Sequence, residues 1–296
     1  MKVSVVVPTY NRKNKLEKCL NALANQTYPK KNYEIIIVDD GSIDGTYEFL
    51  KEKQKEIKNL KIFRQNNKGP AAARNLGIKN AKGKIIFFTD DDVIVPNNWI
   101  EKFLEIFKKY PEIAAVGGYI EASGGTIKKN IFAKYEAYMS RLVYNMPDKV
   151  YIGGFETFGV VTCNAAYKRA VIEEVGYFDE KFPVAAGEDA DLKLRIALKD
   201  YKFAFIPLKA IHIQDYNFKG FWRQQVARGI GNAYFSKKWK NILKSDEEKE
   251  KYNAKPKYNV PLKILKDLKF DIFVLFIISV LANRYGKWKA KKILKS

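Results

Sequence analysis

The first hundred residues alternate short apolar runs with amphipathic segments, and this alternation constrains the fold more than any other feature of the chain. Four runs with an apolar centre predict strands at 3–8, 33–42, 60–65 and 84–92. The intervening segments have helical spacing and predict helices at 14–26, 44–56, 69–81 and 97–110. Strands that are apolar on both faces and alternate with helices predict an α/β fold on a doubly wound, mostly parallel sheet.

The second half of the chain alternates less regularly. Strands are predicted at 114–120, 159–168, 203–206 and 210–213, and helices are predicted to begin near 187 and 218. The segment 240–258 is dense in charge and is predicted to be linker-like. Because 47% of the 296 residues are apolar, the chain can bury a substantial core.

The composition limits the partners of the chain. With 54 Lys and Arg against 33 Asp and Glu, the formal net charge is +21. This excess indicates a nucleic acid, a phosphorylated ligand or an acidic membrane surface as a partner, unless it only favours solubility. Cys19 and Cys163 are the only cysteines, so we expect a reducing compartment rather than a disulfide framework. We expect no secretory leader, because the apolar run after Lys2 is only "VSVVV".

Three polar segments follow strands of the predicted sheet. "PTYN" (8–11) ends the first strand, "DD" (39–40) ends the second and "DDD" (90–92) ends the fourth. Ligands of open α/β sheets bind beyond the carboxyl ends of the strands. We therefore expect these segments to meet on one rim and to form a ligand site.

The three consecutive aspartates, Asp90, Asp91 and Asp92, carry distinctive chemistry. Adjacent carboxylates repel one another and raise one another's pKa. A hard cation such as Mg²⁺ or Mn²⁺ removes this repulsion, and it prefers one or two carboxylates together with substrate phosphates. The alternative is a solvated turn with an aspartate that caps the helix near Asn97, and the triplet alone favours neither.

The end of the second strand offers a candidate nucleoside contact. Asp40 can accept a hydrogen bond from a nucleobase or a ribose, and Pro8 and Tyr10 could wall the base. The alternative is a capped turn, because "DDGSIDGT" is rich in turn-forming residues.

The segment "GEDADLKLR" offers a candidate general base. One of its carboxylates could take a proton from a sugar or lipid hydroxyl. A structural explanation also exists, because acids favour the first turn of a helix and (i, i+4) ion pairs are possible for Asp189 with Lys193 and for Asp191 with Arg195.

Five segments occur in a fixed order: "VSVVVPTYNR", "QTYPKKNYEIIIVDDGSIDGT", "NKGPAAARNLGIKNAKGKIIFFTDDDVIVPNNW", "CNAAYKRAVIEEVGYFDEKFPVAAGEDADLKLR" and "FIPLKAIHI". Together they resemble the family 2 glycosyltransferases, which are inverting, nucleotide-sugar-dependent enzymes of GT-A fold. The resemblance covers Met1 to Ile213. It implies a Rossmann-like, doubly wound, mostly parallel sheet, here with a basic and apolar helical extension at the C-terminus.

The resemblance implies a donor site for a UDP-, GDP- or dTDP-sugar at the strand ends. Its nucleotide-binding residues would be Pro8, Thr9, Tyr10, Asn11, Asp39, Asp40, Arg74 and Asp90. Neither the base nor the sugar is determined by these residues. The acceptor would be a lipid-linked or other glycan.

The resemblance also implies a metal site for Mn²⁺ or Mg²⁺. The family often reads D-x-D-D where this chain begins with Thr89, and counting back from Pro96 makes Asp91 the metal ligand, with Asp92 less certain. A literal DxD reading instead pairs Asp90 with Asp92. His212 lies where the family often has a histidine, which is either a further metal ligand or a structural histidine.

By position, Asp189 would be the catalytic base of the family, with Glu188 and Asp191 as rivals. A single displacement from the face opposite the nucleotide would invert the anomeric configuration. "QVAR" (225–228) is similar to the QxxRW motif of processive members, but Gly229 stands in place of the tryptophan. This departure favours transfer of a single sugar.

We expect a catalytic domain at 1–235, with a nucleotide-binding half at 1–115 and an acceptor half at 116–235, followed by a basic helical tail at 236–296. The tail contains "IFVLFIISVLA" (272–282), which as a helix is about 17 Å long, against a hydrocarbon core of roughly 30 Å. Cationic residues flank this run, so we interpret it as an anchor on an anionic membrane surface and expect a peripheral protein on the cytoplasmic face. A core helix or a tilted span is the alternative.

Three other classes of protein fit the sequence less well. A nucleic-acid binder would carry basic and aromatic residues on the sheet, whereas here the rim is acidic and the basic excess gathers in the tail. A nucleotidyltransferase would place a glycine-rich loop after the first strand, whereas this chain has "PTYNRKNK". An inactive sugar-nucleotide-binding relative is disfavoured by the acids at all three positions.

Overall fold

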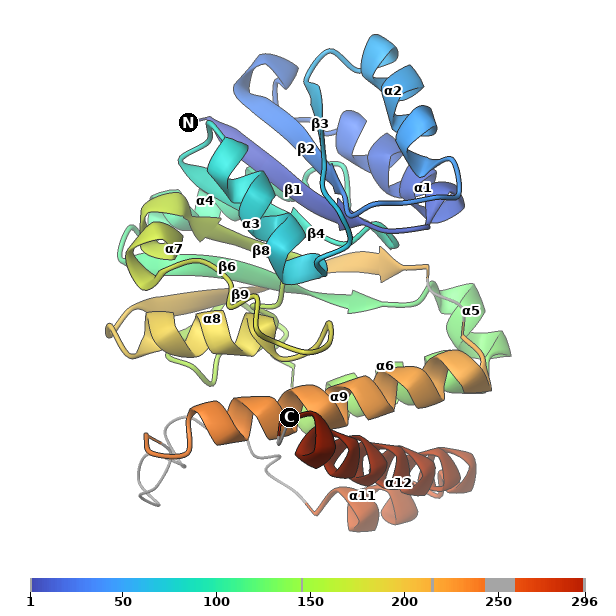
Figure 1. The fold of residues 1–296 in the computed structure, drawn as a ribbon. Helices are drawn as coiled ribbons and strands as arrows, with labels where there is room; N and C mark the ends of the chain where they lie inside the picture. The colour runs from blue at the N-terminus through green and yellow to red at the C-terminus, as the bar shows by residue number, and fades with distance from the viewer. Residues whose placement is uncertain (1, 145, 214–215, 243–258, 295–296) are drawn as a thin grey trace.

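The computed structural model describes residues 2–144, 146–213, 216–242 and 259–294 (Figure 1). The N-terminal half of its sheet is parallel and follows the predicted alternation. The strands lie in the order β3 (Leu60–Arg64), β2 (Tyr33–Asp39), β1 (Val3–Thr9) and β4 (Ile85–Thr89). The carboxyl ends of β1, β2 and β4 therefore share one rim, as predicted.

The second half of the same sheet is mixed. It continues from β4 with the antiparallel β8 (Asn164–Lys168), then β6 (Ile113–Glu121) and β9 (Lys202–His212), and the short β5 (Val93–Ile94) and β7 (Tyr151–Gly153) pair with β9. The two strands predicted at 203–206 and 210–213 are one strand, because β6 pairs with β9 on both sides of a register shift near Pro207. The strand predicted at 159–168 begins only at Asn164.

Helices cover both faces of the sheet. On one face lie α1 (Lys13–Ala24), α2 (Thr46–Glu56) and α4 (Trp99–Lys109), and on the other lie α3 (Pro70–Asn80), α7 (Arg169–Val175) and α8 (Glu188–Ala197). Alternate residues of β1 divide between the two cores: Val5 and Val7 face α1, and Val6 faces α3. The doubly wound α/β fold is thus confirmed. A short 3₁₀ turn, η1 (Lys30–Asn32), precedes β2.

A third layer of helices lies beside the sheet (Figure 1). It contains α5 (Gly124–Lys129), α6 (Ile131–Tyr144), α9 (Phe218–Lys238), α11 (Val260–Lys266) and α12 (Phe270–Ile293). Tyr135, Phe221, Ile264 and Leu275 form its separate apolar core. The sequence did not predict α6. Most of the segment predicted as a linker, 243–258, lies outside the described residues.

The helix α12 packs closely on α9. A Cβ atom added at Gly229 would lie 2.2 Å from the carbonyl oxygen of Asn283, and one added at Gly286 would lie 2.2 Å from that of Val226. One face of α12 is therefore packed against the protein. This agrees with the core-helix alternative given for residues 272–282. Among the described helices, none is both long and apolar enough to cross a membrane.

Candidate functional site

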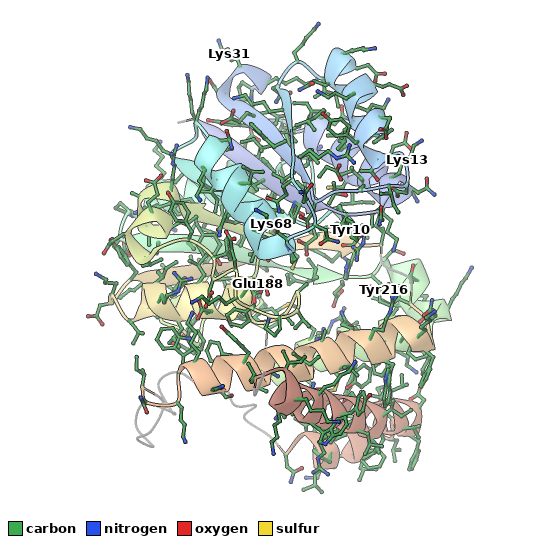
Figure 2. All side chains as sticks on the ribbon, viewed as in Figure 1. Tyr10, Lys13, Lys31, Lys68, Glu188 and Tyr216 are labelled. Atoms are coloured by element: carbon green, nitrogen blue, oxygen red, sulfur yellow. The ribbon has the colours of Figure 1, made fainter. Side chains whose placement is uncertain are left out.

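A cavity of about 400 Å³ opens at the carboxyl ends of β1, β2 and β4. We call it the rim cavity. Nine of the residues predicted for the site line it: Pro8, Thr9, Tyr10, Asp40, Arg74, Asp90, Asp91, Glu188 and Asp189. Figure 2 labels Tyr10 and Glu188, which reach this region from the end of β1 and the start of α8. Five predicted residues lie outside its lining: Asn11, Asp39, Asp92, Asp191 and His212.

Asp40 is buried and organises the turn that begins α3. Its carboxylate accepts hydrogen bonds from the Gln65 amide at 2.8 Å and from the backbone N–H groups of Lys68 at 2.9 Å and Gly69 at 2.8 Å. Asp40 therefore caps the turn before α3 and not its own "DDGSIDGT" turn, in which Asp39 instead accepts from the Ser42 N–H. The same bonds also hold the Lys68–Gly69 turn at the edge of the rim cavity.

Asp39 and Asn11 connect two loops rather than facing the rim cavity. Asp39 is fully buried, accepts a hydrogen bond from the Ser42 N–H at 3.0 Å and lies 3.1 Å from Nε of Arg64. Asn11 accepts a hydrogen bond from the Ile43 N–H at 2.8 Å, and its own N–H donates to the Ser42 hydroxyl at 2.9 Å. These contacts join the β1–α1 loop to the β2–α2 loop.

Asp91 is the buried member of the acidic triplet that faces the rim cavity. Its carboxylate accepts hydrogen bonds from the Thr9 hydroxyl at 2.8 Å and from Arg12 at 3.0 Å. Burial raises the pKa of Asp91 to about 6, although Arg12 opposes this shift, and the neighbouring aspartates reinforce it.

Asp92 turns away from the cavity and is paired. Arg12 approaches its carboxylate at 2.7 Å, and Nε2 of His212 lies 3.3 Å from its other oxygen. Burial opposes its ionisation, but the hydrogen bond and charge of His212 and the Arg12 guanidinium outweigh burial and lower the pKa of Asp92 to about 2. Asp92 and His212 therefore lie side by side behind Asp91.

The donor set around Asp91 can be tested for a divalent metal. In the described part of the chain, no three His, Cys, Asp or Glu side chains are arranged to hold a metal ion by themselves. Asp90 and Asp91 both line the cavity, and Asp91 is a desolvated carboxylate among like charges. Arg12 and Arg74 already pair with these two carboxylates, and as adjacent oxygen donors the carboxylates also fit Mg²⁺ or Mn²⁺, which complete their coordination with water and phosphate oxygens.

Arg74 links the acidic triplet to the start of α8. It is buried, and it donates to Asp90 at 2.9 Å and to Oε1 of Glu188 at 2.9 Å. The other carboxylate oxygen, Oε2 of Glu188, is buried without a hydrogen-bond partner. Burial raises the pKa of Glu188 to about 7, and the charge of Asp189 adds to this shift.

Asp189 lies next to Glu188 at the start of α8. Its carboxylate accepts a hydrogen bond from the Ala190 N–H at 2.8 Å. Burial raises the pKa of Asp189, although this hydrogen bond and the charge of Arg74 oppose it. A carboxylate with a raised pKa is a stronger base than a solvated one, so the position suits proton abstraction.

The loop before Asp189 rests on α9. Gly187 has φ +94°, and a Cβ atom on Gly231 of α9 would lie 2.1 Å from the carbonyl oxygen of Ala186. The rings of Phe182 and Tyr234 are 4.7 Å apart at their centroids. The helix α9 therefore positions the loop that presents Glu188 and Asp189.

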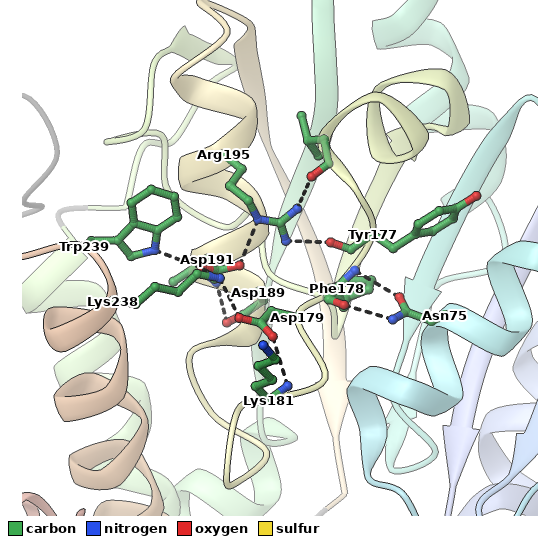
Figure 3. A network of polar contacts seen from close by, with 12 residues as sticks. Asn75, Tyr177, Phe178, Asp179, Lys181, Asp189, Asp191, Arg195, Lys238 and Trp239 are labelled. Atoms are coloured by element: carbon green, nitrogen blue, oxygen red, sulfur yellow. Dashed lines mark hydrogen bonds and ion pairs between the residues drawn. The ribbon is translucent and has the colours of Figure 1, made fainter. Parts of the chain in front are cut away.

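Asp191 belongs to a separate buried network (Figure 3). It lies 2.9 Å from Nε of Arg195, 2.9 Å from Nε1 of Trp239 and 2.6 Å from Nζ of Lys238. The predicted pair of Asp191 with Arg195 is present. Lys193 does not pair with Asp189, because its ammonium group donates to the carbonyl of Thr157. Among the three acids, Asp191 thus fastens α8 to the end of α9.

The sequence pattern did not indicate Arg12, which lines the rim cavity and pairs with two of the three aspartates. The available signal was a cation three residues after the end of the first strand, on the rim where the acids gather. Further along the chain, Arg228 pairs with Glu136 of α6 at 3.1 Å, and Gln225 donates to the same carboxylate at 3.1 Å. This part of α9 therefore packs against α6 within the third layer of helices.

Comparisons with known proteins agree with this geometry. The model of the family described as glycosyl transferase family 2 matches residues 4–176. Glycosyltransferase AglE of Haloferax volcanii is 31% identical over 207 residues, which are 69% of this chain and 64% of that protein. The chain spans less than two thirds of the length of AglE and of two further curated relatives.

A second relative is covered more fully. It is the dolichyl N-acetyl-α-D-glucosaminyl phosphate 3-β-D-2,3-diacetamido-2,3-dideoxy-β-D-glucuronosyltransferase of Methanococcus voltae, which is 30% identical over 260 residues, 81% of this chain and 76% of that protein. Among solved structures, the mannosyltransferase PcManGT of Pyrobaculum calidifontis, in complex with GDP-Man and Mn²⁺, has a TM-score of 0.65 at 20% identity. The alignment covers 99% of this chain and 74% of that one, and it shows a shared fold.

Proposed function

The chain belongs to glycosyl transferase family 2, and from this premise we propose that it transfers a single sugar from a nucleoside-diphosphate sugar to an acceptor hydroxyl with inversion. The observation that carries the proposal is the rim cavity, in which Arg74 joins the acidic triplet to the Glu188–Asp189 pair. The binding place for a donor diphosphate, at the acidic triplet, is thus adjacent to the candidate base in the Glu188–Asp189 pair.

The donor binds along the strand ends in this proposal. Pro8 and Tyr10 flank the nucleobase, and the turn held by Asp40 borders it. Asp90 and Asp91 hold a divalent cation, Mn²⁺ or Mg²⁺, which when bound would offset the negative charge that grows on the leaving diphosphate. Asp92, which His212 contacts, shares Arg12 with Asp91, so these residues help to hold Asp91 in position.

Asp189 is the proposed base. It takes the proton of the acceptor hydroxyl while that oxygen attacks the anomeric carbon from the face opposite the nucleotide, and the bond to the diphosphate breaks. Its raised pKa supports this role. Glu188 is the rival, but Arg74 already holds one of its oxygens. One displacement inverts the anomeric configuration.

The names of relatives support a lipid-linked or cell-envelope acceptor. One is named for a dolichyl phosphate sugar, and another, from Staphylococcus aureus, for poly(ribitol-phosphate). We propose the division into a catalytic domain at 1–235, with halves at 1–115 and 116–235, and a basic tail at 236–296 that meets the cytoplasmic face of a membrane. The continuation of α9 to Lys238 joins the two parts.

A thermal-shift screen of UDP-, GDP- and dTDP-sugars, with and without Mn²⁺, tests the donor site. We expect one nucleoside diphosphate to raise the midpoint of unfolding, and to do so more strongly with Mn²⁺. An Asp91→Asn variant should lose the dependence on Mn²⁺. If no nucleoside diphosphate stabilises the protein, the proposed donor site is wrong.

A further inference from the structure

The helix α12 has two apolar faces, and only one of them is packed. The inner face is buried against the neighbouring helices and includes Ile272, Leu275, Ala282 and Gly286. A second set of apolar residues recurs every three or four positions, which places them along one side of the helix. These are Phe270, Val274, Ile277, Leu281, Tyr285 and Trp288, and each is between 43% and 66% exposed.

This exposed stripe continues onto α9 through aromatic contacts. Ring centroids lie 6.2 Å apart for Phe218 and Trp222, 6.4 Å apart for Trp222 and Tyr285, and 5.7 Å apart for Tyr285 and Trp288. We call the stripe, together with Phe218 and Trp222, the outer apolar face. Adjacent to it, Leu268 is 77% exposed in the turn before α12. A contiguous apolar surface of this kind marks an interaction site rather than an ordinary solvent-exposed surface.

Cations lie at the two ends of the outer apolar face. In α11 and α12 the exposed ones are Lys266, Arg284, Lys287, Lys289, Lys291 and Lys292. The ammonium of Lys292 lies 4.1 Å from the ring centroid of Trp288. The acids of this segment are neutralised, since Asp271 pairs with Lys134 at 2.5 Å and Asp267 pairs with Lys263 at 2.7 Å. The surface is therefore apolar and net positive.

We propose that the outer apolar face lies flat on an anionic lipid bilayer at the boundary between headgroups and acyl chains, with its aliphatic side chains toward the acyl chains and the rings of Tyr285 and Trp288 at the level of the headgroups. Tryptophan and tyrosine favour this interfacial level, and lysines beside them attract anionic headgroups. The inference deepens the proposed function, on which it rests, because it identifies the contact residues and their orientation.

The stripe favours a bilayer over other occupants. A second copy of this chain would bring the same lysines face to face without acids to neutralise them. A glycan would find polar partners scarce along Val274, Ile277 and Leu281. The stripe from Phe270 to Trp288 is about 27 Å long, which suits a helix lying in the plane of the membrane.

The inner face of α12 connects the proposed membrane contact to the catalytic site. The close contacts at Gly229 and Gly286 hold α12 against α9, and Gly231 of α9 supports the loop at Ala186 that leads to Asp189. A bilayer bound to the outer apolar face therefore lies at a set distance from the proposed base. This arrangement suits an acceptor that is embedded in the same bilayer.

The test is co-sedimentation of the full chain with vesicles of phosphatidylcholine mixed with phosphatidylglycerol, compared with phosphatidylcholine alone. We expect binding to the mixed vesicles, weakened by salt, with a blue shift of tryptophan emission that a Trp288→Phe variant reduces. Ile277→Asp and Leu281→Asp should each lower partitioning about tenfold. Both side chains are exposed, so the fold should persist.

The matched control is Ile43→Asp, which adds the same charge at a residue that is 89% exposed in the nucleotide-binding half. It should leave partitioning unchanged. Unaltered sedimentation of an Ile277→Asp/Leu281→Asp double variant would overturn the proposal, as would a dimer in light scattering that these substitutions dissociate. Stabilisation by nucleotides is measured on the same variants without vesicles, so a failure of the donor site is distinguishable from a failure of membrane binding.

Discussion

The rim cavity and the outer apolar face are built on opposite principles. The cavity gathers acids and holds them with two arginines, Arg12 and Arg74, in a largely buried setting. The outer apolar face gathers exposed apolar side chains and has lysines at its two ends. In a chain of net charge +21, acids are therefore concentrated at the cavity and cations beside the outer apolar face.

The helix α9 lies between these two regions and contacts both. Gly231 and Lys238 face the loop and helix that carry Asp189, whereas Val226 and Gly229 face α12. The buried network of Asp191 belongs to the first contact (Figure 3). The two regions can thus be perturbed separately, and variants in α9 should affect both.

The largest expected effect is on transfer at the cavity. Asp189→Asn should lower the rate of sugar transfer by about 10²- to 10⁴-fold, because it removes the proposed base, and should keep the nucleotide-dependent thermal shift. Asp191→Asn should lower thermal stability instead, since it weakens the bonds to Lys238 and Trp239. Unchanged turnover in Asp189→Asn would remove this residue as the base.

The next effect concerns Arg74. Arg74→Ala should lower the free energy of unfolding by about 3–5 kcal/mol, because it leaves Glu188 buried without its counter-charge. Urea unfolding measures this loss. Arg228→Ala removes an ion pair whose arginine is 43% exposed, so it should change the free energy of unfolding by less than about 1 kcal/mol. Equal effects of the two variants would contradict the description of Arg74 as a buried link.

A smaller effect is expected in α9. Gly229→Ala should destabilise the protein by about 1–3 kcal/mol, because the added methyl group meets the Asn283 carbonyl of α12. It should also weaken vesicle binding. Gly124→Ala is the control, since nothing lies within 4 Å of a Cβ atom there. If both variants behave alike, α12 is not held in place by this contact.

The last expected effect is a difference in pH dependence within the triplet. The pKa of Asp91 is raised from 3.8 to about 6, so ionising it disfavours the folded state, and its contribution to stability is lost as pH rises through about 6. The pKa of Asp92 is lowered to about 2, so its contribution is lost as pH falls from 3.8 to about 2. Asp91→Asn should flatten the first change and Asp92→Asn the second, as measured by unfolding across this pH range.

The strand–helix alternation predicted much of the fold, because buried parallel strands and their helices leave local patterns in the sequence. It did not predict that residues 202–212 form one strand, since pairing with β6 maintains the strand on both sides of the irregularity near Pro207. Nor did it predict α6, whose partners Ile264 and Leu275 come from the far end of the chain.

At the candidate site, the sequence located most of the acids. Nine residues that were predicted from the carboxyl ends of the strands and from the family motifs line one cavity. The sequence could not distinguish the role of Asp189 from that of Asp191, because both occupy the first turn of α8 and only their surroundings differ. It also missed Arg12, because the role of this arginine depends on side chains about eighty positions away.

By itself, then, the sequence determined the family, the α/β fold and the rim on which the acids gather, since these follow from local periodicity and from motifs in order. Only the tertiary structure decided which carboxylates face the cavity and which are held elsewhere, because burial and pairing depend on distant segments. It likewise decided that α12 presents one apolar face to α9 and another to solvent. Helical spacing reveals both faces, but packing determines which of them is covered.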